Sequence, residues 1–524
     1  MQYFYDLIKT KIINNNDCIL QCNCQLIMTL CAFLIIIICS SVACDSGSSD
    51  DSINPTETNS QENNINQNNA NQNNANQNNN NTNENNSTSV INKTSQITHH
   101  GITWYFDKDY EYGQYATGDY WVVGPVTIEN INPQPNFKNE TYLHGSMINP
   151  APLTEGNSYQ GWTSETVYYK HELNVGMPNG EKISSSNPLV VTVHSSLCSS
   201  ISRSEGIRPF VDTIAILTVV ETKPDEGDFR PSYISNDKTS QYNLNDIDFS
   251  IVDKKIIPVT STEDISVYEA YLEKPWIDIV YNYRFGDLAP LSNMAVYGRE
   301  YSHITSEVPL MLMMDISNEE KRILMLRYVQ LGLDLYAIMK SGFLWMSQGG
   351  WMHGRKLPIL FTGMVLNDTN MINDVTAAAV SSENPKIFQE DGQHFYISES
   401  DVAIDHATWS GAPRPSIEYI QGDADNNIPE WGIGHDHTAS YDNRNWLADY
   451  RAVVGSSSVA TALAVYFLEA RSIWGNEAFF DYMDRYMTNM SVLSDHEWSE
   501  QGTLFGREMW NEYRSNFLST HPLW

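Results

Sequence analysis

Short runs of aromatic and β-branched residues, separated by turn residues, fill the chain from about residue 100 to residue 220. Gly, Pro and Asn lie between these runs. Several short strands with turn signals between them are typical of a sandwich. We therefore predict a β-sandwich-like domain at residues 99–260. Its expected strands are 102–106, 120–123, 126–128, 166–169, 189–193 and 213–220.

In the second half, apolar residues recur at helical spacing. Ser317 is followed three positions later by Glu320, which is a capping-box start. Apolar side chains then repeat every three or four residues until Gly342. Together with the first half, the pattern predicts an α+β multidomain protein with an α-helical domain at residues 261–524. Further helices are expected at 356–366, 446–471, 476–490 and 508–518.

The N-terminal region contains one long apolar run, which starts at Leu26 and ends in small residues before Cys44. This pattern resembles the signal peptide of a bacterial lipoprotein, and the resemblance implies cleavage before Cys44 and a lipid on its sulfur. The alternative is an uncleaved helix, because the run is close to the roughly 18 to 20 residues that a membrane span needs. Either anchor places the rest of the chain at the cell surface or in the periplasm.

Residues 45–98 consist mainly of Asn, Gln, Ser, Thr and Asp. A segment with so few apolar residues cannot offset the entropy of ordering, so we expect a disordered tether. The chain has 31 Lys and Arg against 64 Asp and Glu, a net charge of −33, which argues against nucleic acid as a partner. Six of the seven cysteines lie at or before Cys44. The remaining one, Cys198, is expected to be a buried, inert thiol.

Three polar clusters carry candidate chemistry, and the first spans residues 349–356. It contains Trp351, His353, Arg355 and Lys356 directly before a predicted helix, after two glycines. A helix N-terminus with an arginine is suited to binding an anion such as a carboxylate or sulfate. The alternative is a structural turn with solvated basic residues.

The second cluster spans residues 389–396 and contains adjacent Glu390 and Asp391 with His394 nearby. A carboxyl group and a histidine can serve as acid and base. The alternative is a turn at Asp391–Gly392 between two strands.

The third cluster spans residues 431–446 and precedes the long helix predicted at 446–471. On an extended backbone His435 and His437 face the same way, an arrangement that also allows a divalent cation, although we expect no metal or other cofactor. Tyr441, Arg444 and Asn445 follow at the start of the helix. The alternative is a polar network that caps the helix N-terminus.

Helical hairpins behind a β-sandwich resemble secreted bacterial polysaccharide-active enzymes with an (α/α) toroid, including heparinase-like and alginate-lyase-like enzymes. The resemblance is one of layout across about 420 residues. A complete toroid needs about twice the helices that the pattern predicts. The resemblance therefore implies an incomplete toroid or further helices within residues 262–310 and 370–405.

The resulting hypothesis is β-elimination on an extracellular glycan that contains uronate. His435 and Tyr441 are the expected base and acid, and His353 completes the pocket. Substrate contacts are expected from Trp351, Arg355, His437, Arg444 and Asn445. One alternative is a glycoside hydrolase that uses paired carboxylates, chosen from Asp391, Glu430 and Asp436. The other is a glycan-binding surface lipoprotein without catalytic activity.

Overall fold

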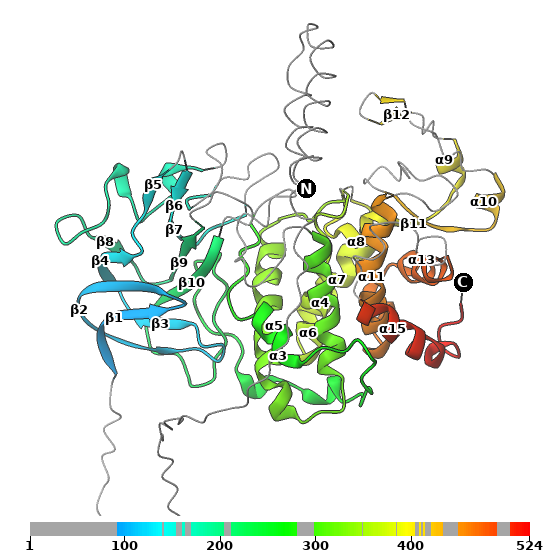
Figure 1. Ribbon diagram of the computed structural model, residues 1–524, viewed down its shortest axis with the longest axis horizontal. Coiled ribbons are helices and arrows are strands. Elements are labelled where there is room, and N and C mark those ends of the chain that lie inside the picture. Colours follow the sequence, from blue (N-terminus) through cyan, green and yellow to red (C-terminus); the bar gives the residue numbers. More distant parts are fainter. Residues whose placement is uncertain are drawn as a thin grey trace, which may run out of the picture. The chain divides into compact units, whose positions relative to one another are not determined.

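β-structure in the first part and helices in the second part confirm the predicted α+β class (Figure 1). The computed structural model describes residues 92–138, 141–152, 160–162, 169–203, 211–279, 298–347, 349–383, 385–403, 408–409, 412–413, 421–432, 449–489 and 504–523. Cys44, the apolar run before it and most of the expected tether lie outside these residues.

The described strands of the first part form one curled eight-stranded sheet rather than two facing sheets. Its order is β7-β9-β10-β3-β2-β4-β8, and β1 pairs with β2. The pairing of β3 with β10 is parallel, and the other pairings in this sheet are antiparallel. The strands are β1 (Lys93–His99), β2 (Ile102–Gln114), β3 (Tyr120–Val123), β4 (Val126–Asn132), β7 (Ser146–Ile148), β8 (Leu189–Val191), β9 (Ser195–Ser202) and β10 (Val211–Val220), with β5 (Asn136–Lys138) and β6 (Thr141–Leu143) as a separate pair.

Strand β10 lies at the centre of the packing because both of its faces are buried. Ile214 and Ile216 join the core that the sheet shares with the helices. Ala215 and Leu217 face a second core inside the sheet. Successive side chains of a strand point to opposite faces, so burial on both sides explains the continuous apolar run in this segment.

Several strands depart from the expected boundaries, and β1 and β9 show why. Strand β1 begins at Lys93, inside the range assigned to the tether, so the sheet starts earlier than composition predicts. Strand β9 was missed because it is rich in serine. Its serines are buried, and Ser199 Oγ lies 2.8 Å from Ser146 Oγ and accepts a hydrogen bond from Trp104 Nε1. Cys198 in this strand is buried, and burial raises the pKa of its thiol to about 12.

The helical part contains the predicted helices and also several that the pattern did not reveal. Ser317 caps the helix after it, and its side chain and that of Glu320 form the expected reciprocal capping box. The helices are α3 (Ile265–Tyr271), α4 (Gly298–Leu312), α5 (Asn318–Lys340), α6 (Lys356–Val365), α7 (Thr369–Val380), α8 (Gln389–Gln393), α9 (Glu399–Val402), α10 (Gln421–Asp425), α11 (Asp449–Phe467), α12 (Arg471–Trp474), α13 (Glu477–Thr488) and α15 (Leu504–Tyr513).

Helices α3, α4, α7, α8 and α9 occupy the two regions where the resemblance implied further helices. The described residues between α7 and α11 also contain β11 (His394–Tyr396) and β14 (Pro429–Trp431), which pair with each other. Helix α4 packs against α11, and α6 packs between α5 and α7. These contacts do not establish a closed toroid.

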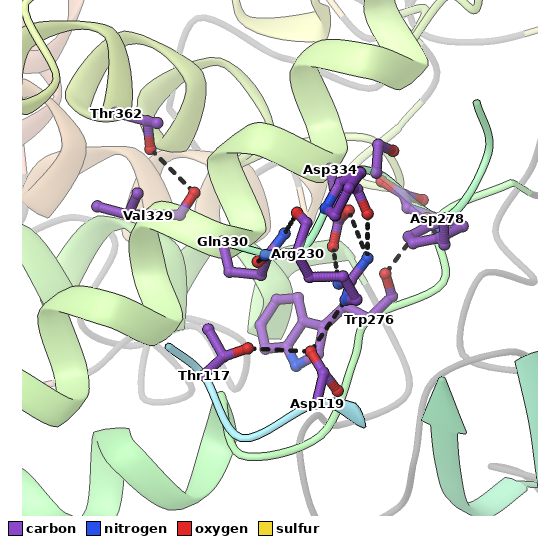
Figure 2. Close-up of polar contacts among 12 residues, drawn as sticks. Thr117, Asp119, Arg230, Trp276, Asp278, Val329, Gln330, Asp334 and Thr362 are labelled. Carbon is purple, nitrogen blue, oxygen red and sulfur yellow. Dashed lines mark hydrogen bonds and ion pairs between the residues drawn. The ribbon is translucent and has the colours of Figure 1, made fainter. Parts of the chain in front are cut away.

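Arg230 connects the sheet with the helices through two buried ion pairs (Figure 2). Its Nε donates to Asp119 Oδ2 at 2.9 Å, in the loop between β2 and β3. Its Nη2 and Nη1 donate to the two carboxylate oxygens of Asp334 on α5, at 2.6 Å and 3.2 Å. We call these three residues the Arg230 junction.

Candidate functional site

The loop before α6 and the short helix α8 meet in one buried polar network, which we call the α6–α8 network. The first two sequence clusters, separated by more than thirty residues, therefore come together. None of the side chains in the network is more than 6% exposed. The network consists of Asp278, His353, Arg355, Lys356, Gln389, Glu390, Asp391 and Gln393.

A glycine allows the loop before α6 to approach α4 and α8 closely. Gly354 has a φ of +87°, and a Cβ atom at this position would lie 2.6 Å from the Ser302 Cα atom of α4. The backbone N–H of Gly354 donates to Glu390 Oε1 at 2.7 Å. Asp391 and Gly392 lie within α8 rather than in a turn between two strands, so the hairpin interpretation of the second cluster is wrong.

The two cations of the first cluster are paired with buried carboxylates. Arg355 Nε donates to Asp278 Oδ2 at 2.9 Å, and the guanidinium carbon lies 3.6 Å from the centre of the Tyr301 ring. Lys356 Nζ donates to Asp391 Oδ1 at 2.5 Å. Arg355 also donates to the carbonyl oxygen of His353 at 2.7 Å. Arg355 thus fixes the position of the His353 backbone.

Hydrogen bonds fix the tautomer of His353. Gln393 Oε1 accepts from Gln389 Nε2 at 3.0 Å and from Trp431 Nε1 at 3.2 Å, and Gln393 Nε2 donates to the carbonyl of Gly349. These donors identify the oxygen of the Gln393 amide. His353 Nε2 lies 2.8 Å from that oxygen, so Nε2 carries the proton. Nδ1 then has a free lone pair, and no residue that the structure describes is its hydrogen-bond partner.

Burial shifts the pKa values of the titratable groups in the network. It lowers the pKa of His353 to about 4, with Arg355 acting in the same direction and the hydrogen bond to Gln393 opposing it. Burial raises the pKa of Asp391 to about 6 despite the nearby Lys356. The pKa of Glu390 is also raised by burial, against the hydrogen bonds to its carboxylate. Such shifts are frequent at functional sites.

The described part of the third cluster touches the same network. Trp431 donates to Gln393, and the N–H of Gly432 donates to the carbonyl of Gln393 at 2.9 Å. Glu430 is buried and lies 3.2 Å from Arg485. Trp351 is partly exposed. Outside the described residues lie His435, Asp436, His437, Tyr441, Arg444 and Asn445, whose roles remain predictions.

Four residues of this site, Asp278, Tyr301, Gln389 and Gln393, were missed or given no role. Asp278 and Tyr301 lie in segments without a recognisable motif, and only the tertiary fold brings them to Arg355. Gln393 stands inside the second cluster, but nothing local shows that it contacts His353. An amide three positions after an acidic residue carries no chemical signal of its own.

A separate cavity of about 380 Å³ lies on another face of α4. Its lining residues are Ser261, Glu263, Tyr268, Tyr271, Glu300, His303, Ile304, Glu307, Leu504 and Phe505. Glu300, His303 and Glu307 share one helix face because they are three, four and seven residues apart. Glu307 is buried and accepts from the Tyr268 hydroxyl at 2.8 Å. Burial lowers the pKa of His303 to about 3, so its ring is neutral.

Within the described residues, no group of three or more His, Cys, Asp or Glu side chains is arranged to hold a metal ion. No helix there combines the length and apolar character of a bilayer span. Comparison of the chain with family models, with curated proteins and with solved structures finds no match.

Proposed function

We propose that the protein degrades an extracellular polysaccharide by β-elimination and that His353 is the base. The observation that carries the proposal is the fixed tautomer of His353 with its unpartnered Nδ1. A general base needs a free lone pair and must be unprotonated at the working pH, and proton transfer is most efficient when its pKa lies near that pH. A pKa of about 4 meets the second condition at neutral pH.

In this reaction Nδ1 removes the proton on the carbon next to the uronate carboxylate. The proposal assigns the base to His353 rather than to His435 because His353 has a defined tautomer. Arg355 is proposed to position the histidine, since it is paired with Asp278 and bonded to the His353 carbonyl. Arg444 and Asn445 stay the expected partners of the substrate carboxylate. His353 is only 1% exposed, so substrate binding requires movement of the chain around it.

The test is a panel of acidic glycans incubated with the full-length protein. β-Elimination creates an unsaturated uronate, which absorbs in the near ultraviolet. His353→Ala should lower kcat/KM by about 10²-fold or more, the usual effect of losing a general base. The matched control is His194→Asn, which changes an exposed histidine in a left-handed turn that asparagine tolerates. Full activity of His353→Ala would overturn the assignment.

Hydrolysis in the α4 cavity is the second candidate. Glu300 and Glu307 are two helical turns apart, which separates their Cα atoms by about 10 Å along the axis. Glycoside hydrolases use two carboxyl groups about 5 to 9.5 Å apart, and Tyr268 and Tyr271 offer rings for sugar stacking. This reaction produces new reducing ends without near-ultraviolet absorbance. In that case Glu307→Gln, and not His353→Ala, should abolish product formation.

A further inference from the structure

We infer that Glu390 is an uncharged carboxylic acid at neutral pH and that it donates a proton to the leaving oxygen of the glycan. The first half of this inference depends only on the α6–α8 network. The second half rests on the proposed β-elimination. Nothing in the sequence distinguishes Glu390 from the adjacent Asp391, and the distinction comes from their different partners.

The charges of the network are the first argument. Arg355 is paired with Asp278, and Lys356 is paired with Asp391. Glu390 is a third carboxyl group of the network, and it forms no ion pair with any residue that the structure describes. Glu390 is 2% exposed. An ionised carboxylate at such a position costs several kcal/mol unless it is paired, so the group takes up a proton instead.

The hydrogen bonds of Glu390 are the second argument. Oε1 accepts from the Gly354 N–H at 2.7 Å, whereas Oε2 has no hydrogen-bond partner in the described part of the chain. An ionised group would leave a charged oxygen without a donor. In the acid form Oε2 carries the proton. Oε2 can then donate a hydrogen bond to an acceptor on a ligand. Burial raises the pKa of Glu390, and it outweighs the backbone hydrogen bonds from Glu390 and Gly354 and the nearby charges of Lys356 and Arg355, all of which lower it.

The position of Glu390 relative to the base is the third argument. Gly354, which bonds Glu390, directly follows His353. One short stretch of backbone therefore holds the proton acceptor and the proton donor.

The proposed step is balanced. His353 Nδ1 takes the C5 proton, and the electron pair of the broken C5–H bond forms the C4–C5 double bond. The C4–O bond breaks, and the leaving oxygen receives the proton of Glu390 Oε2. Solvent later returns a proton from His353 to Glu390.

Infrared spectra of the full-length protein at pH 7 test the protonation without any substrate. The difference between wild type and Glu390→Gln should show the loss of a carboxylic-acid carbonyl band. The control Glu383→Gln, at an exposed position, should show only the loss of an ionised carboxylate band. Loss of an ionised band in Glu390→Gln would overturn the inference, whatever the activity of the protein.

Two substrates test the role as proton donor. On the natural glycan, Glu390→Gln should lower kcat by about 10²-fold. A synthetic uronate with fluoride at C4 needs no proton on its leaving group, so the variant should keep nearly full activity on it. His353→Ala should lose activity on both. Equal losses of Glu390→Gln on the two substrates would reject the donor role, and absence of any elimination by wild type would reject only the proposed function.

Discussion

The Arg230 junction and the α6–α8 network are both buried charge clusters, and they differ in how completely their polar atoms are paired. At the junction, Arg230 donates to Asp119 and to both carboxylate oxygens of Asp334. Thr117 and His99 lie against the two oxygens of Asp119, at 3.1 Å and 3.6 Å. Each of these carboxylate oxygens therefore has a polar neighbour.

In the α6–α8 network, by contrast, three buried atoms have no hydrogen-bond partner among the residues that the structure describes. They are His353 Nδ1, Glu390 Oε2 and Asp391 Oδ2. Leaving a buried polar atom unpaired costs stability, and native proteins do so rarely. The comparison teaches that burial of charge alone does not indicate a function. A fully paired cluster connects parts of a fold, whereas unpaired atoms leave proton acceptors and donors available to a ligand.

The largest expected effect is at the junction. Arg230→Met should lower the free energy of unfolding by about 3–5 kcal/mol, because it leaves Asp119 and Asp334 buried without a cation. Urea unfolding followed by circular dichroism measures the loss. The control Arg322→Met removes an exposed arginine and should change stability by less than about 0.5 kcal/mol. Similar values for the two variants would show that the junction does not hold the fold together.

A pH-dependent effect is expected in the network. The folded-state pKa of His353 is about 4 and the unfolded value is 6.5, so the unfolded chain binds the proton more readily. This difference in pKa stabilises the folded state above pH 6.5, and the stabilisation is lost as the pH falls through about 4. Over this window the wild type should lose about 3 kcal/mol relative to His353→Gln. A constant difference between the two unfolding free energies across this range would contradict the buried, neutral histidine.

The smallest effects on stability are expected when one carboxyl group of each cluster is replaced by an amide. Glu390→Gln replaces an uncharged acid by an uncharged amide, so stability at pH 7 should change by less than about 1 kcal/mol. Asp334→Asn removes a charge that Arg230 requires and should cost about 2 kcal/mol. If the Glu390 variant lost as much stability as the Asp334 variant, the two clusters would not differ in how completely their charges are paired.

Local signals in the sequence predicted the elements that depend on local interactions. Ser317 and Glu320 lie three residues apart, and the capping box that they form needs no tertiary contact. The Asp391–Gly392 pair is typical of a turn, yet it lies in a helix because Asp391 bonds the buried Lys356 of another segment. At this position tertiary contacts override the local preference for a turn.

The candidate site was predictable only in part for the same reason. His353 stood out because it lies beside glycines and basic residues. The partners that define its chemistry, Gln393 and Glu390, are about forty residues away in the chain. A single sequence does not show which distant residues meet.

Strand β1 would have a mechanical consequence if the protein is held by its N-terminus, as the sequence predicts. It begins at Lys93, inside the last residues of the segment expected to be a tether, and it pairs in this sheet with β2 as a hairpin. A pull on the N-terminus reaches the Lys93–Glu111 pair first and the His99–Ile102 pair last. The load therefore acts on the pairs of β1 with β2 in this order, and β1 detaches while β10 stays paired with β9 and β3.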